Sequence, residues 1–183
     1  MAKKDLPGND RDTKEKFLAN TPENGKQQPR HLLKITRILN APPSTVFKAW
    51  TDPMQLAKWW GPTGYTNPVC KLDLKPGGGI YIDMKSSDGT VFPMKGIIHE
   101  IANPSKLVFS SFAFEDEAGH AHLEILNTVT FEEYQGKTML TLNAEIQKVT
   151  AEVGEAMKGV TNMDDGWNQS LDRLEELVED ELS

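Results

Sequence analysis

The segment LAKWWGPTGYT, residues 56–66, decides how the chain is organised around it. Two adjacent tryptophans, Trp59 and Trp60, precede Gly61-Pro62, and a strand-like segment follows. Adjacent residues of a helix point about 100° apart, so one indole can pack into the domain while the other lies at the rim of a cavity. Two interpretations stay open: both tryptophans anchor the core, or one of them closes the mouth of a pocket.

The residues before this segment predict one strand and two short helices. HLLKITRILNAP, residues 31–42, alternates like a strand, and PPSTVFKAW, residues 42–50, predicts a helix with Ser44 or Thr45 near its N-cap. A second helix begins with Asp52 as N-cap and Pro53 at its first position. Gly61-Pro62 ends that helix, so the two helices lie end to end.

The residues after it predict an antiparallel meander. Six strand-like runs cover about residues 65–74, 79–86, 90–102, 105–114, 122–133 and 137–147. The joints KPGGG, SSDGT, ANPSK, EDEAGH and EYQGK are short and rich in turn-forming residues. Consecutive hairpins of this kind build a single antiparallel sheet.

The chain closes with a long predicted helix, about residues 151–180. Its apolar stripe at helical spacing consists of Met163, Trp167, Ser170, Leu171, Leu174, Leu177 and Val178. Gly159 and Gly166 inside it indicate a close approach to another element, or a bend. The predicted fold class is therefore α+β: a curved seven-stranded antiparallel sheet wrapped around a long C-terminal helix, with two short helices between strands 1 and 2.

Composition limits the function classes. The chain has 183 residues, a formal net charge of −7 and one cysteine, Cys70. We expect no nucleic-acid partner, since no basic footprint is present, and no membrane span, since no apolar run is long enough. The lone cysteine favours a cytoplasmic location. Residues 1–29 are polar and predict a flexible tail before a domain covering residues 30–183.

Several stretches resemble a known family. They include APPSTVFKAWTDPMQLAKWWGP, LDLKPGGGIYIDM, DGTVFPMKGIIHEI and MDDGWNQSLDRLEEL, and the resemblance spans about residues 31–178. The chain is similar to the START-like, birch-pollen-allergen-like (SRPBCC) superfamily with its helix-grip fold, and more narrowly to the homologues of the activator of the heat-shock protein 90 ATPase. The resemblance implies a ligand-binding fold, because members of the superfamily bind sterols, lipids and polyketides, and a minority are cyclases or hydrolases.

We therefore expect an apolar or amphipathic small molecule, lipid-, sterol- or polyketide-like, to bind between the C-terminal helix and the sheet. The predicted wall consists of Trp60, Ile82, Met84, Phe92, Met94, Ile98, Phe112, Met163 and Trp167. One alternative is a protein-interaction module, although a chaperone partner is the weaker expectation. Another alternative is a cyclase- or hydrolase-type enzyme using the same cavity.

The candidate catalytic and metal patterns are weak. His120, His122 and Glu124 have the spacing of one strand face but lack a further ligand. His99 and Glu100 are neighbours on a strand, so they face opposite ways and cannot act on one proton together. We expect no catalytic residues, no metal and no cofactor.

Overall fold

The computed structural model describes residues 30–150 and 163–180. Its elements in chain order are β1 (Arg30–Leu39), α2 (Pro43–Thr51), α3 (Pro53–Trp59), β2 (Thr66–Leu72), β3 (Gly79–Lys85), β4 (Val91–Ala102), β5 (Lys106–Glu115), β6 (Ala121–Tyr134), β7 (Lys137–Val149) and α5 (Met163–Asp180). The predicted strands and the two end-to-end helices are confirmed within a few residues. The expected tail, residues 1–29, lies outside the described residues.

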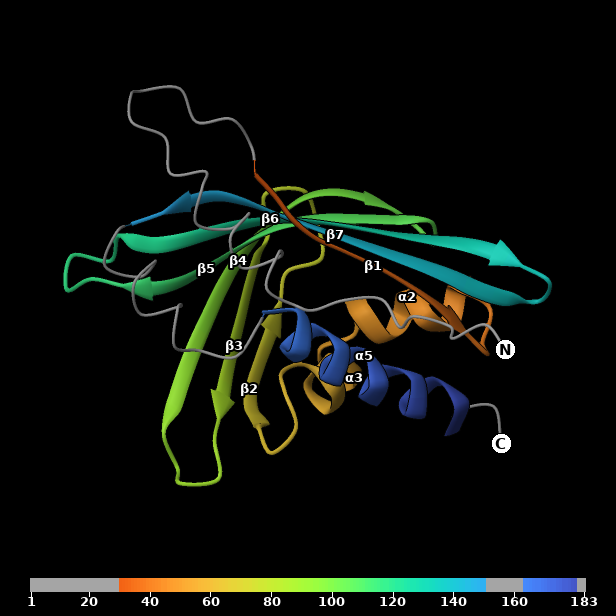
Figure 1. The fold of residues 1–183 in the computed structure, drawn as a ribbon, viewed down its shortest axis with the longest axis horizontal. Coiled ribbons are helices and arrows are strands. Elements are labelled where there is room, and N and C mark those ends of the chain that lie inside the picture. Colours follow the sequence, from red (N-terminus) through yellow and green to blue (C-terminus); the bar gives the residue numbers. More distant parts are fainter. Residues whose placement is uncertain (1–29, 151–162, 181–183) are drawn as a thin grey trace, which may run out of the picture.

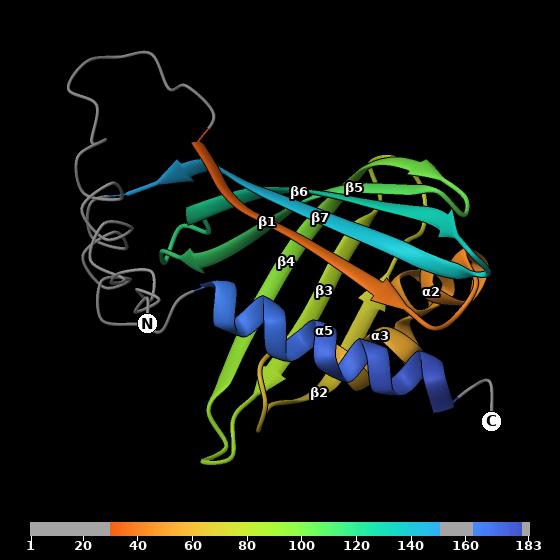
Figure 2. The ribbon, with the colours of Figure 1, turned by 45° about the vertical axis from the view of Figure 1, so that its right-hand side comes forward.

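The seven strands form one antiparallel sheet in the order β1-β7-β6-β5-β4-β3-β2. In Figures 1 and 2, β2, β3 and β4 run steeply across the direction of β1, β6 and β7, and α5 lies in the angle between them. Helices α2 and α3 lie on the same side of the sheet as α5. This arrangement is the predicted helix-grip fold.

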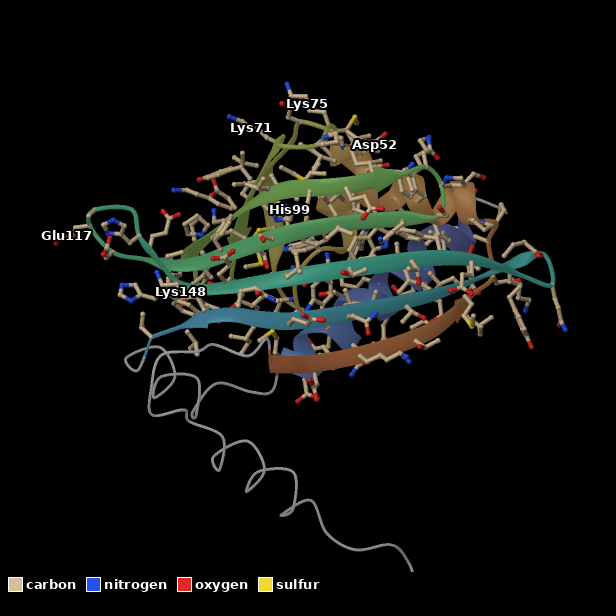
Figure 3. The ribbon with its side chains drawn as sticks, turned by 90° about the horizontal axis from the view of Figure 1, so that it is seen from above. Asp52, Lys71, Lys75, His99, Glu117 and Lys148 are labelled. Atoms are coloured by element: carbon tan, nitrogen blue, oxygen red, sulfur yellow. The ribbon has the colours of Figure 1, made fainter. Side chains whose placement is uncertain are left out.

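The strand register gives the sheet an inner face toward the helices and an outer face. The pairs Ile82–Met94 and Ile98–Phe109 lie on the inner face, where all four side chains are buried. Thr36 pairs with Thr141 on the outer face, which Figure 3 shows from above with the helices behind it. Alternating apolar residues thus place the core between the sheet and the three helices.

The helix starts follow from proline and aspartate. The Asp52 carboxylate accepts hydrogen bonds from the amides of Met54 and Gln55 at 2.8 and 3.4 Å, so it is the N-cap of α3 as predicted. Helix α2 is confirmed, but the cap expected from Ser44 or Thr45 is not found, because the N-cap is Pro42 and no side chain caps it. Pro43 at the first helical position already has the required φ angle, so the helix begins before Ser44.

The described part of the C-terminal helix carries the predicted stripe. Ser170, Leu171, Leu174 and Val178 are buried, and Met163, Trp167 and Leu177 pack against the core. The prediction that another element approaches Gly166 closely is wrong, because a Cβ placed there would meet nothing within 4 Å. Residues 151–162, with Gly159, lie outside the described residues. No helix within the described ranges is long and apolar enough to cross a membrane.

A polar clamp holds the turn that ends α3. The Arg173 guanidinium on α5 donates to the carbonyls of Lys58 at 2.6 Å and Gly61 at 3.2 Å. The Asn67 amide donates to the carbonyls of Ala57 and Trp60 at 2.9 and 2.7 Å. These donors satisfy carbonyls that the helix end leaves without intrahelical partners. The clamp therefore fixes the Trp-Trp-Gly-Pro turn to both β2 and α5.

We predict that Arg173→Met lowers the free energy of unfolding by about 1–3 kcal/mol, because the charged hydrogen bonds to the α3 carbonyls are lost while the apolar stem remains. Urea unfolding followed by circular dichroism measures the change. The matched control is Lys34→Met, which removes an exposed cation from the outer face of β1 and should change stability by less than about 0.5 kcal/mol. Equal stability of the two variants would contradict the clamp.

We also predict that Gly166→Ala raises the free energy of unfolding by about 0.5–1 kcal/mol, because alanine loses less backbone entropy in a helix and its methyl group meets open space. The same urea titration measures the effect. A destabilised Gly166→Ala variant would show that the space beside this glycine is needed.

Candidate functional site

All four tryptophans of the chain belong to one aromatic cluster between the helices and the sheet. The ring centroid of Trp50 on α2 lies 4.7 Å from that of Trp59 and 6.0 Å from that of Trp167, on which it stacks. Trp60 contacts Trp167 edge to face at 5.2 Å. The sheet adds Phe109 and Phe131. The cluster therefore connects all three described helices to the sheet.

The two adjacent tryptophans have different positions within this cluster. Trp59 is fully buried, and its indole N–H donates to the Ala49 carbonyl at 2.9 Å, so it anchors α3 to α2. Trp60 is also buried, but its ring lines a small cavity. Both therefore belong to the core, and Trp60 in addition faces a space.

This cavity lies between the short helices and strands β2 to β5. It is lined by Trp50, Leu56, Trp60, Leu72, Leu74, Ile80, Ile98, Leu107 and Phe109. About 10 Å³ is open to the centre of a water-sized sphere, which is room for roughly one water molecule. Leu74 is 46% exposed, so the cavity lies close to the surface. Of the predicted wall, Trp60 and Ile98 line it.

The strand register separates the predicted wall into two groups. Ile82, Met94 and Ile98 are buried on the inner face, as the predicted pocket requires. Phe112 pairs with Lys95 and Glu124, which places it on the outer face, away from the helices. Phe112 is therefore not brought together with the other predicted residues.

Two further predicted residues lie under the turn after α3. The Met84 sulfur would be 3.4 Å from a Cβ on Gly61, a residue whose φ of +88° favours glycine. The Phe92 ring lies 6.0 Å from that of Tyr65 and remains 43% exposed. The turn thus covers Met84 directly and reaches the edge of Phe92.

The last two predicted residues belong to α5. Met163 begins this helix and, like Trp167 one turn later, is partly buried against the core cluster. Trp167 also contacts Trp60, so the start of α5 and the Trp-Trp-Gly-Pro turn meet at the same place. The inner-face residues, the turn and the start of α5 surround one region, which we define as the candidate site.

Sequence reasoning missed the small residues on the inner face of β4 and β5 that border this region. Gly96 and Ser111 are neighbours on the inner face, and Ala113 follows on β5, so three small residues lie side by side there. Gly96 is required by the backbone, since a Cβ there would be 2.6 Å from the Ser110 carbonyl oxygen, and the Ile80 side chain packs over it. Ser111 and Ala113 are only partly buried.

Asn127 was also missed. Its side chain is 1% exposed on the inner face of β6, opposite Phe109 and Ala144. Its amide nitrogen lies 3.0 Å from the Ser111 hydroxyl oxygen, and its Oδ1 has no hydrogen-bond partner among the described residues. The available signal is that an asparagine interrupts the apolar alternation Leu123, Ile125, Val129, Phe131.

The histidines do not assemble a reaction centre in the described structure. The expectation that His99 and Glu100 face opposite ways is wrong, because the register shifts between Ile98 and Glu100 and both side chains lie on the outer face. There His99, labelled in Figure 3, contacts the buried Ser110 hydroxyl at 2.8 Å, and Glu100 pairs with Lys106 at 2.9 Å. His122 contacts Thr150 at 3.0 Å, and His120 instead contacts Asp116. Within residues 30–150 and 163–180, no three His, Cys, Asp or Glu side chains gather as a metal site.

Cys70 lies on the inner face of the edge strand β2, opposite Ile82. It is a free thiol that packs partly against the core. Burial, and to a smaller extent the negative charge of Asp52, raise the pKa of this thiol from 9.0 to about 11. The thiol is therefore protonated and inert at neutral pH.

The geometry and the comparisons together place the protein in a class. A strongly curved antiparallel sheet around a C-terminal helix, with an apolar inner face, defines a START-like helix-grip protein. The chain belongs to the family of Activator of Hsp90 ATPase homolog 1-like proteins, whose model matches residues 40–179. Among curated proteins, none matches the chain.

Solved structures of bacterial proteins share this fold. A protein from Chromobacterium violaceum is 26% identical, with a TM-score of 0.63, and the match covers 80% of this chain and 96% of that one. One from Mycobacterium smegmatis is 25% identical, with a TM-score of 0.64 and coverages of 86% and 96%. One from Arthrobacter aurescens is 24% identical, with a TM-score of 0.68 and coverages of 80% and 85%.

We predict that Cys70 reacts with iodoacetamide at pH 8 about 100-fold more slowly than an ordinary thiol, because a pKa raised by two units leaves about one hundredth as much thiolate. Labelling over time, followed by mass spectrometry, measures the rate. The rate should increase about tenfold per pH unit up to about pH 11, and the protein unfolded in guanidinium is the control. A plateau near pH 9 in the folded protein would contradict the raised pKa.

Proposed function

We propose that the protein binds an apolar or amphipathic small molecule between α5 and the inner face of the sheet. Ligand binding at this place is consistent with the helix-grip fold. We also propose a cytoplasmic location, which the single cysteine supports.

The observation that carries the proposal is the chemistry of the inner face around Ser111. Four strand segments form this part of the inner face: Met94 to Ile98, Phe109 to Ala113, Leu123 to Asn127 and Ala144 to Ile146. Every side chain that they direct toward the helices is uncharged. Within this wall Ser111 and Ala113 have small side chains and are only partly buried. An apolar wall of this kind, bordered by aromatic rings, suits a hydrophobic ligand.

The wall can also adapt to a ligand. The existing cavity is too small for anything beyond about one water molecule, so a ligand must displace side chains. Met84, Met94 and Met163 border the candidate site, and methionine repacks easily because its chain is unbranched and flexible. We infer that binding moves these methionines and the turn after α3 apart.

A protein-interaction module is the second candidate. The family description supports it, and so does the 42% exposure of Ile97 on the outer face. Several-fold stimulation of ATP turnover by the heat-shock ATPase would favour this candidate. An enzyme has less support, because the described strands place no titratable side chain on the inner face around Ser111 that could transfer a proton.

We predict that Ala113→Trp weakens binding of the neutral fluorescent probe N-phenyl-1-naphthylamine at least about tenfold, because the indole occupies the ligand's space. Fluorescence titration measures binding, and a thermal melt shows whether the variant is folded. The matched control is Thr128→Trp, which places the same indole on the outer face and should leave probe affinity unchanged.

Two results would contradict the ligand site. One is an absence of probe binding to the wild-type protein. The other is equal probe affinity in wild type and Ala113→Trp, which would place the bound probe elsewhere. If the space is filled in the native protein, Ala113→Trp should instead lower stability by about 1–3 kcal/mol through overpacking.

A further inference from the structure

The side chain of Asn127 is a buried polar group on the inner face of the sheet, beside Ser111. Across the inner face its neighbours are Phe109 on β5 and Ala144 on β7. Its amide nitrogen lies near three acceptors, 3.0 Å from the Ser111 hydroxyl oxygen, 3.3 Å from the Ile125 carbonyl and 3.4 Å from the Phe109 carbonyl. Because all three are acceptors, the amide orientation is fixed with nitrogen toward them.

This orientation leaves Oδ1 of Asn127 as a buried acceptor with no partner among the described residues. Such groups are rare in native proteins, since a buried acceptor that loses its hydrogen bond to water destabilises the fold. Leucine would have nearly the same shape without this cost. A ligand that donates a hydrogen bond to Oδ1 explains why an amide is present.

Ser111 complements Asn127. Its Oγ can accept the hydrogen bond from the Asn127 amide, which leaves its own O–H free to donate. Ser111 is also only partly buried, so a ligand can reach it. Together the two side chains offer one acceptor and one donor. A hydroxyl group, which donates and accepts, matches this pair.

The charge of the surroundings decides between a hydroxyl and a carboxylate. The inner-facing side chains around Ser111 and Asn127 are uncharged. On β1, the Arg37 guanidinium is held by Asn168 at 2.7 Å and by Asp172 at 3.4 Å. Its Nε is a buried donor with no partner among the described residues, but Arg37 pairs with Leu140, four residues along β7 from Ala144, the neighbour of Asn127. A carboxylate buried beside Asn127 would therefore lose its hydration without gaining a neighbouring cation from the described strands.

We propose that Asn127 and Ser111 recognise a neutral hydroxyl group on an otherwise apolar ligand, so that the ligand class is an alcohol rather than a fatty acid. This inference rests on the proposed function, because it needs a ligand in the candidate site. It adds that hydrogen-bond donation by the ligand contributes to affinity.

The test compares three probes of similar length. 1-Octanol and 1-methoxyheptane have the same atoms, but only the alcohol donates a hydrogen bond, and octanoate carries a charge. Each competes with N-phenyl-1-naphthylamine in a fluorescence displacement assay. We expect the wild-type protein to bind 1-octanol about tenfold more tightly than the ether, and octanoate more weakly than either.

Asn127→Leu should reduce the preference for the alcohol over the ether to within about twofold, because the acceptor is gone. The matched control is Asn143→Leu, which makes the same change on the outer face of β7 and should keep the preference. Should Asn127→Leu fail to fold, the wild-type protein still tests the proposal, because equal binding of alcohol and ether would contradict it.

The outcomes separate the two proposals. If the dye binds and the alcohol and ether displace it equally, or octanoate displaces it best, the hydroxyl site is wrong while the apolar site stands. If Asn127→Leu folds and keeps the preference, the hydroxyl is recognised elsewhere and the proposal is likewise wrong. If neither dye nor probes bind the wild-type protein, the proposed function itself fails and the hydroxyl site with it.

Discussion

The packing of Trp50 against its aromatic neighbours is the contact on which the rest of the structure depends. Its helix has nine residues and the next helix has seven, and helices this short are not stable alone in water. They persist because Trp50 contacts Trp59 of α3, Trp167 of α5 and two phenylalanines of the sheet. Each aromatic contact adds about 0.5–1.5 kcal/mol beyond the area it buries. One side chain thus fixes the relative positions of helices and strands.

The candidate site lies at the edge of this cluster, where packing gives way to smaller and more flexible side chains. On one side, Trp60 and Trp167 are held rigidly by ring contacts and by the Arg173 clamp. On the other side lie methionines and the small residues Ser111 and Ala113. A rigid wall facing an adaptable one is suited to holding a ligand in a defined orientation while accommodating its size.

The sequence predicted the fold well because strands and hairpins leave local signals. Alternation and short turns located every strand, and Asp52-Pro53 located the start of α3. Phe112 was predicted in the wall because large apolar residues lie on both faces of β5. Only its pairing with Lys95 and Glu124 shows that it lies on the outer face. Asn127 was missed because a polar residue in a strand is ordinarily assigned to the exposed face. Arg173 was missed because its partners are backbone carbonyls more than a hundred residues away.

The pairing of β1 with β7 has a consequence for how the chain acquires its structure during synthesis. Strand β1 pairs with β7, as in Ile35 with Leu142, and helices α2 and α3 are held by residues of α5. On a ribosome these N-terminal elements emerge long before their partners. Contacts of such large sequence separation form slowly, since a long loop must close before they gain anything. The apolar face of β1 and the sides of α2 and α3 that pack on α5 therefore stay uncovered until about a hundred further residues have been made, and exposed apolar surface of this kind is prone to aggregate before folding is complete.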